Sequence, residues 1–295
     1  MGCPYLNRRG FLKLAGTAGV AAVALPGLAG AKPEADSPGL LIDTTLCRGC
    51  RACEAACTEQ NQQPPPEKCG DRSVFGADRD LGPERYTVVN MKGDAAHQVF
   101  VKRQCMHCLE PACASACLAR ALDKTPEGPV IYHPERCIGC RYCMVACPFE
   151  IPKFEYQSAA PYIRKCQFCF SRQKEGKQPA CASVCPSGAL KFGRREELLE
   201  EAKTRIYQNP DKYVHHVYGE HEAGGTSVLY LSSVPFESLG LPDVGTRGYP
   251  ELTRGALGTV PFVMTLWPPL LMGLYAFRNR KPEQPATPDQ EEHHE

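Results

Sequence analysis

Hydrophobic residues form several short runs along the middle of the chain and one long run near each end. The short runs at residues 40–42, 130–132, 189–192 and 227–231 have the length and apolar content of buried β-strands. Residues 194–208 carry apolar side chains at helical spacing on one face and predict an amphipathic helix. Together these segments predict an α+β fold with little regular structure for its length.

The first long run occupies residues 14–28 and follows Arg8 and Arg9, which lie in the segment Asn7-Arg8-Arg9-Gly10-Phe11-Leu12-Lys13. Small residues come next, in Ala29-Gly30-Ala31. This order predicts a twin-arginine signal peptide over residues 1–31, which exports cargo that has already folded around its cofactor. An ordinary N-terminal helix with adjacent arginines is the alternative.

The second long run, residues 255–277, contains no charged residue. At about 1.5 Å per residue, a helix of this length reaches about 34 Å, enough to cross a bilayer. We therefore predict a transmembrane helix at 255–277. Basic residues at the start of the following tail, residues 278–295, favour a cytoplasmic C-terminus.

Three prolines interrupt this second run, at Pro261, Pro268 and Pro269. Prolines are tolerated inside a bilayer when neighbouring helices satisfy the freed carbonyl groups. The prolines therefore predict a membrane-embedded partner. A buried core helix or an interfacial helix remains the alternative to a membrane span.

Composition adds the size of the body, the absence of a basic surplus and, above all, an unusual number of cysteines. The 295 residues allow about two domains, and 43% hydrophobic residues suffice for a packed core in the body, residues 32–254. The net charge of +1 argues against nucleic-acid binding, which needs a basic surplus. The unusual feature is the 18 cysteines, too many to be merely buried thiols.

Sixteen of these cysteines form four groups of four. The first and third groups have the spacing C-x2-C-x2-C-x3-C that binds [4Fe–4S] clusters, with the fourth cysteine ligating a different cluster from the first three. Sixteen thiolates suffice for four such clusters. The groups are Cys47, Cys50, Cys53 and Cys57; Cys105, Cys108, Cys113 and Cys117; Cys137, Cys140, Cys143 and Cys147; and Cys166, Cys169, Cys181 and Cys185.

Other uses of cysteine fit this spacing less well. Disulfides suit an exported protein, but the closely repeated cysteines leave neighbours too cramped for a sensible set of bridges. Zinc favours widely separated C-x-x-C pairs, which only the fourth group resembles. Covalent haem needs C-x-x-C-H, which does not occur. Cys69 lies outside every group, in a polar insertion at residues 58–104, and is interpreted as a free thiol.

With these groups in view, the chain resembles the multi-cluster ferredoxin-like electron-transfer subunits of membrane-bound respiratory oxidoreductases. Within them it is most similar to the iron–sulfur subunit of periplasm-facing [NiFe] uptake hydrogenases of the hydrogenase-2 type. The resemblance covers nearly the whole chain. It includes the leader at 7–13, Gln104-Cys105-Met106-His107-Cys108, the third group through Pro148, segments at 193–198, 218–226 and 234–237, and the terminal span.

The resemblance implies two nested bacterial-ferredoxin-like [4Fe–4S] dicluster lobes followed by a C-terminal transmembrane helix. The outer lobe would comprise residues 32–104 and 166–254, and the inner lobe residues 105–165. It also implies how the groups share four clusters: Cys47, Cys50, Cys53 and Cys185; Cys57, Cys166, Cys169 and Cys181; Cys105, Cys108, Cys113 and Cys147; and Cys117, Cys137, Cys140 and Cys143.

The implied function is electron transfer from the small and large catalytic subunits of a hydrogenase to an integral-membrane quinone-reactive subunit, on the periplasmic side of the bacterial inner membrane. The chain itself offers no catalytic residues, no dinucleotide fingerprint and no phosphate-binding loop. The same role in a molybdenum or tungsten enzyme such as formate dehydrogenase is the nearest alternative. A metal-stapled membrane scaffold that passes no charge is a third hypothesis.

Overall fold

The computed structural model describes residues 37–93 and 97–279. The contacts divide the chain after Pro250 into two compact units, and each is considered by itself. The predicted signal peptide at 1–31 and nearly all of the predicted tail at 278–295 lie outside the described residues.

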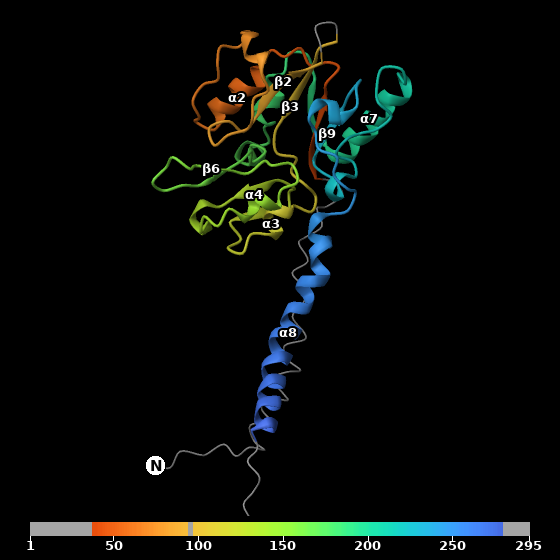
Figure 1. Ribbon diagram of the computed structural model, residues 1–295. Coiled ribbons are helices and arrows are strands. Elements are labelled where there is room, and N and C mark those ends of the chain that lie inside the picture. Colours follow the sequence, from red (N-terminus) through yellow and green to blue (C-terminus); the bar gives the residue numbers. More distant parts are fainter. Residues whose placement is uncertain (1–36, 94–96, 280–295) are drawn as a thin grey trace, which may run out of the picture. The chain divides into compact units, whose positions relative to one another are not determined.

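The first unit is built on a three-stranded sheet in the order β8-β1-β9 (Figure 1). The central strand β1 (Pro38–Asp43) pairs antiparallel with β8 (Leu190–Arg194) and parallel with β9 (Val228–Leu231). The helix α7 (Arg195–Gln208) follows β8 directly. The runs at residues 40–42, 189–192 and 227–231 and the helical pattern at 194–208 are thus confirmed within a residue or two.

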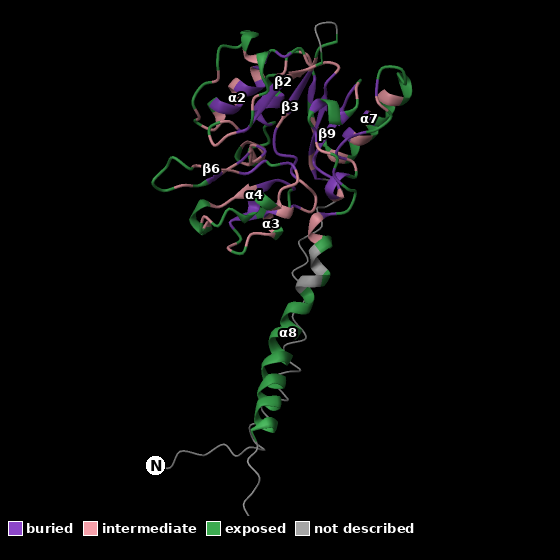
Figure 2. Ribbon diagram, viewed as in Figure 1, coloured by how far each residue is buried: buried purple, intermediate pink, exposed green. Residues whose placement is uncertain are grey.

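Both faces of this sheet are covered, which is why its strands contain uninterrupted apolar residues. On one face Leu41 and Leu229 pack with Leu198 of α7. On the other face Leu40 and Tyr230 belong to the larger core that also contains many of the cysteines. Figure 2 shows this buried interior in purple. The sheet therefore forms one wall of the region where the cysteines gather.

A second layer of the core is a β-hairpin inside the segment that the sequence presents as a polar insertion. Strands β2 (Val88–Lys92) and β3 (Val99–Arg103) pair antiparallel. Val88, Val89 and Val101 are fully buried. This hairpin is missed by the hydrophobic pattern because polar residues of the same strands are buried as well.

The remaining elements of the first unit are short. Two further hairpins pair β4 with β5 and β6 with β7, and α2 packs against α6 as α3 packs against α4. The strand predicted at residues 130–132 is confirmed as β5. The elements are α2 (Ala52–Gln60), η2 (Ser73–Gly76), α3 (Ala112–Ser115), β4 (Leu122–Lys124), β5 (Val130–Tyr132), η3 (Pro134–Arg136), α4 (Tyr142–Ala146), β6 (Lys153–Phe154), β7 (Ile163–Arg164), α5 (Phe170–Lys174), α6 (Ala180–Ser183), η4 (Glu222–Gly224) and η5 (Phe236–Leu239).

The long helix α8 (Tyr249–Arg278) carries the apolar run at 255–277. It continues through Pro261, Pro268 and Pro269, and its segment Gly258–Arg278 is long and apolar enough to cross a membrane. The described side chains from Glu251 onward are exposed, as the green helix in Figure 2 shows. By its length and composition this segment is a candidate membrane span.

Candidate metal centres

The first and third cysteine groups share one loop geometry. In each loop a glycine before the second cysteine and an arginine after it adopt left-handed backbone angles: Gly49 (φ 66°) and Arg51 (φ 63°), then Gly139 (φ 70°) and Arg141 (φ 61°). Each arginine immediately precedes a helix, α2 or α4. The chain therefore curls through the first two cysteines and places the third on the first helical turn.

The second and fourth groups share a different geometry. The seven residues Pro111 to Cys117 recur as Pro179 to Cys185, with Ala116 replaced by Val184 as the only difference. In both copies the proline precedes a four-residue helix, α3 or α6, which carries the third cysteine of its group. This short internal repeat is a sequence signal that cysteine spacing alone does not reveal.

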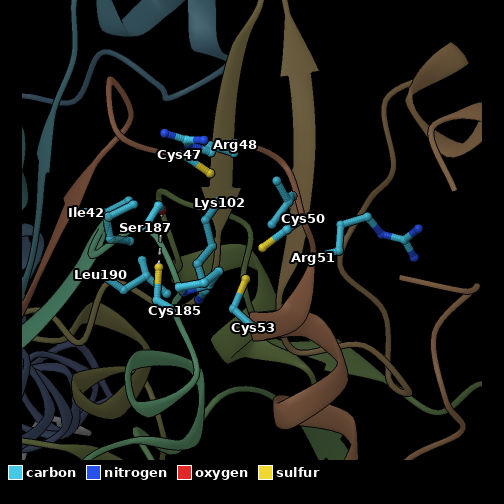
Figure 3. Close-up of a pocket in the computed structure, with 13 residues that line it drawn as sticks. Ile42, Cys47, Arg48, Cys50, Arg51, Cys53, Lys102, Cys185, Ser187 and Leu190 are labelled. Atoms are coloured by element: carbon cyan, nitrogen blue, oxygen red, sulfur yellow. Dashed lines mark hydrogen bonds between the residues drawn. The ribbon is translucent and has the colours of Figure 1, made fainter. Parts of the chain in front are cut away.

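The first quartet consists of Cys47, Cys50, Cys53 and Cys185, which line one cavity together (Figure 3). Three of them come from the first group and the last from the far end of the fourth. Apolar side chains of the three-stranded sheet and the hairpin complete the wall, among them Ile42 and Val89. The side chain of Lys102 enters the same cavity from β3.

A second cavity is lined by Cys57, Cys166, Cys169 and Cys181. Phe168, which is almost fully buried, forms part of its wall. Lys102 lines this cavity too, together with Gln104. The cavity of the first quartet and that of the second therefore have Lys102 in common.

The other eight cysteines gather as two sets around α3 and α4. The pKa of the Cys108 thiol is raised by burial and by the neighbouring thiols of Cys113, Cys147 and Cys105. Burial raises the pKa of Cys143 to about 12, and the thiols that add to this shift are Cys117, Cys137 and Cys140. The thiols named in each of these two shifts lie near one another, and the sharing of ligands among four clusters stays a prediction.

Backbone N–H groups point at several of these sulfur atoms. Gly139 N–H donates to Cys137 Sγ at 3.4 Å, Phe168 N–H to Cys166 Sγ at 3.3 Å, and Ala121 N–H to Cys117 Sγ at 3.2 Å. The amide of Asn61 donates to Cys57 Sγ at 3.6 Å. Such donors favour the thiolate form that a metal needs, whereas burial opposes it and raises the pKa of Cys57 to about 12.

Among residues 37–93 and 97–279, no group of three or more His, Cys, Asp and Glu side chains is arranged to hold one metal ion. All the cysteines described there are free thiols. The side-chain nitrogen Gln104 Nε2 is buried without a partner among the described residues, and Gln104 lines the cavity of the second quartet, which suits a donor to cluster sulfur.

Neighbouring quartets adjoin one another. The cavities of the first and second quartets have Lys102 in common. Cys113 of the third quartet lies on α3 and Cys143 of the fourth lies on α4, and these two helices pack together.

The junction between the second and third quartets is aromatic. His107, between Cys105 and Cys108, stacks on Phe168, with ring centroids 4.7 Å apart and an interplanar angle of 18°. His107 Nδ1 accepts a hydrogen bond from the N–H of Val130 at 3.0 Å. Burial and the nearby Lys165 hold the pKa of His107 well below its usual value, so the ring is neutral with its proton on Nε2.

Some residues fall outside this arrangement. Cys69 is exposed and lines neither of the two cavities; its Sγ lies 3.9 Å from the carbonyl oxygen of Arg51. Cys3 lies outside the described residues. Lys102 was missed by the sequence analysis, because lysine does not suggest a buried site and Lys102 lies in the segment interpreted as a polar insertion. Gln104 was named only as part of the motif that precedes Cys105, with no role assigned to it.

Comparison with known proteins supports this chemistry. The family model described as a 4Fe-4S dicluster domain matches residues 96–195, which contain the second, third and fourth cysteine groups. A Nitratidesulfovibrio vulgaris protein whose name states no function is 50% identical over 97% of this chain and 80% of its own length.

Two other relatives carry informative names. The hydrogenase-2 operon protein HybA of Escherichia coli O157:H7 is 38% identical over 85% of this chain and 87% of its own length. The formate dehydrogenase-O iron–sulfur subunit of Escherichia coli K12 is 35% identical over 78% of this chain and 76% of its own length. Both relatives therefore extend the similarity well beyond the segment matched by the family model.

Proposed function

The chain belongs to the family of 4Fe-4S dicluster iron–sulfur subunits, and on that premise we propose that it carries electrons from a periplasmic [NiFe] hydrogenase catalytic core to a quinone-reactive membrane subunit. The protein is an iron–sulfur electron-transfer subunit of hydrogenase-like or formate dehydrogenase-like oxidoreductases. The hydrogenase assignment and the number of clusters are the parts that we propose.

Four [4Fe–4S] clusters would be held by the four quartets. The support is that each quartet combines cysteines from two groups and surrounds one place in the fold. The ligands would be Cys47, Cys50, Cys53 and Cys185 for the first; Cys57, Cys166, Cys169 and Cys181 for the second; Cys105, Cys108, Cys113 and Cys147 for the third; and Cys117, Cys137, Cys140 and Cys143 for the fourth.

The observation that carries the proposal is that neighbouring quartets adjoin. The first and second cavities share Lys102, His107 stacks on Phe168 between the second and third quartets, and α3 packs against α4 between the third and fourth. When bound, each cluster would supply reversible one-electron chemistry. The protein's contribution is to hold neighbouring sites close, to exclude water with buried residues such as Phe168, and to aim N–H donors at sulfur.

The outer lobe would face the catalytic subunits and the inner lobe the membrane partner. The margin of the fourth quartet supports this orientation, because large apolar side chains next to its cysteines are exposed; they are Leu118, Ile138, Tyr142 and Val145. Exposed apolar groups of this size are common at protein interfaces. The helix α8 would anchor the chain with its C-terminus in the cytoplasm, after export by the twin-arginine leader at 1–31.

Formate dehydrogenase is the second candidate partner, and the 35% identity to a formate dehydrogenase subunit favours it. The twin-arginine leader together with an anchor of the chain's own favours hydrogenase, because subunits of molybdenum enzymes often travel on a partner's leader. A scaffold that passes no charge is the third candidate. Clusters that fail to cycle with hydrogen or quinol would favour the scaffold.

Metal analysis tests the cluster count. The anaerobically purified full chain is expected to contain about 16 iron and about 16 acid-labile sulfide atoms, four of each per cluster. Half these values, or stoichiometric zinc, would contradict four clusters.

Gentle detergent purification of the complex tests the partner. Nickel that co-purifies with the chain supports the hydrogenase assignment. Molybdenum or tungsten instead of nickel would contradict the hydrogenase assignment and support formate dehydrogenase as the partner. In either case the chain's own iron content provides the internal reference for stoichiometry.

A further inference from the structure

Lys102 is a buried cation placed between two cysteine quartets. It lies on β3, only 2% of its surface is exposed, and it lines the cavities of both the first and the second quartet. Figure 3 shows its side chain running from β3 toward Cys185 and Cys53. The hydroxyl of Tyr230 donates to the Lys102 carbonyl at 2.7 Å, which holds this part of the strand in place.

The charge of Lys102 has no carboxylate partner among the described residues. Its ammonium donates to Gln104 Oε1, a neutral acceptor. A buried lysine is rare unless its charge is compensated. The cysteines of the two cavities that Lys102 lines are therefore the groups whose negative charge can compensate it.

Gln104 extends this arrangement toward the second quartet. Its Oε1 accepts from Lys102, which orients the amide so that the nitrogen is the free end. Gln104 Nε2 is buried without a partner among the described residues. Gln104 lines the cavity of the second quartet and is absent from the lining of the first. Of these two cavities, Gln104 therefore borders only that of the second quartet.

Two other buried or nearly buried lysines differ from Lys102. Lys165 Nζ donates to the carbonyls of Val130 and Cys166 at 2.5 and 2.8 Å, and Lys124 Nζ donates to the carbonyl of Cys108 at 2.9 Å. Their ammonium groups are thus engaged by backbone oxygens. Lys102 combines full burial, a single neutral partner and contact with two cavities.

We propose that Lys102 and Gln104 form an electrostatic bridge that raises the reduction potentials of the first and second clusters, with Lys102 acting on both and Gln104 on the second alone. This inference rests on the proposed electron-transfer function. Reduction adds one electron to a site that is already negative, so a fixed buried cation stabilises the reduced form. An N–H donor aimed at sulfur acts in the same direction.

The test is an EPR-monitored redox titration of the anaerobically purified full chain. In Lys102→Met, which keeps an unbranched side chain one atom shorter and removes the charge, two of the four potentials should fall. At a fixed applied potential the ratio of reduced to oxidised cluster should drop at least tenfold, which is 59 mV for a one-electron couple. Gln104→Met should lower one of the same two potentials and leave the other three unchanged.

Arg103→Met is the matched control, because it removes the same charge from the next residue of β3. The Arg103 side chain is 25% exposed and pairs with Asp80 at 3.6 Å, so solvent screens it. In Arg103→Met, the ratio of reduced to oxidised cluster at a fixed applied potential should change less than threefold for each of the four clusters. If Lys102→Met leaves all four potentials unchanged, or shifts all four equally, the bridge does not exist.

Iron and sulfide analysis accompanies every titration. If Lys102→Met fails to assemble its clusters, Gln104→Met decides the question, since it keeps the charge: one lowered potential supports the bridge, and four unchanged potentials overturn it. A wild-type chain without four redox-active clusters would defeat the proposed function itself. That outcome is distinct from the one in which the wild-type chain has four redox-active clusters and Lys102→Met leaves their potentials unchanged.

Discussion

Gly49 and Gly139 occupy equivalent positions in the first and third cysteine loops, yet a side chain would meet different surroundings at the two. Both have left-handed backbone angles, which cost a non-glycine residue about 1–2 kcal/mol. A Cβ at Gly49 would lie 2.5 Å from the ring of Phe100, whereas a Cβ at Gly139 would lie 4.0 Å from the ring of Phe154.

Gly49→Ala should therefore damage the protein more than Gly139→Ala does. In both variants an alanine must adopt a left-handed backbone conformation, but only Gly49→Ala also forces the buried Phe100 ring to move. We expect a lower Tm and a reduced iron content for Gly49→Ala, measured by thermal unfolding and metal analysis under anaerobic conditions. Equal losses in the two variants would show that packing against Phe100 does not matter.

Glu54 is a buried carboxylate that joins the first cysteine helix to the β2–β3 hairpin. It accepts hydrogen bonds from Arg51 Nε at 3.2 Å, from Arg79 Nη2 at 2.6 Å and from the N–H of Val89 at 2.6 Å. Only 1% of the Glu54 side chain is exposed, and the Arg51 side chain is fully buried. Loss of the carboxylate charge would leave two guanidinium groups without their central partner.

Glu54→Gln should lower the free energy of unfolding by about 3–5 kcal/mol, the range for breaking a buried ion pair from one side. Anaerobic urea unfolding followed by circular dichroism measures this. Glu175→Gln is the control, because Glu175 and Lys177 form an exposed pair. A Glu54→Gln curve that overlays the control would contradict a structural role for the network.

At the scale of secondary structure, the sequence predicted the elements whose hydrophobic pattern is undisturbed. The strands β1, β5, β8 and β9 and the helix α7 fall within a residue or two of the predicted positions. The β2–β3 hairpin was missed because Asn90 and Lys102 are polar but buried, and this breaks the alternation that marks a strand. Their burial depends on tertiary partners that the sequence does not display.

The candidate site, like the fold, could be predicted only in part. Cysteine spacing separated the four groups, but only the resemblance indicated which groups share a cluster. The helices α3 and α6 that carry Cys113 and Cys181 have four residues each, too few for periodicity to reveal. Lys102 could be found only from the structure, since its role follows from its burial and from the two cavities that it lines.

The helix α8 leads to a prediction at this scale. Deletion of residues 255–277 should leave the iron and sulfide content unchanged, because the quartets lie wholly in the first unit. The same deletion should release the protein from membranes, since the segment Gly258–Arg278 is the candidate span. Metal analysis and sedimentation of membrane fractions measure the two effects. A deleted chain that still sediments without its partners would contradict the anchor.

At the scale of the whole first unit, the proposed succession of clusters from the first quartet to the fourth means that electrons would enter and leave at opposite ends. The margin of the fourth quartet is the end where apolar side chains are most exposed, with Leu118 at 86% and Val145 at 82%. Both residues lie beside ligand candidates, Leu118 directly after Cys117 and Val145 two residues after Cys143. This margin is therefore the expected docking surface for the membrane partner.

Val145→Asp should slow electron delivery to quinone without altering the clusters, because a desolvated carboxylate in an apolar interface opposes docking. In membranes that contain the whole complex, we expect at least a tenfold lower rate of substrate-dependent quinone reduction. Reduction of a small soluble dye by the same complex should stay at the wild-type rate, since a dye needs no docking surface. Tyr207→Asp supplies the control, as Tyr207 is equally exposed but lies on α7. Equal quinone rates in the two variants would place the exit for electrons elsewhere on the molecule.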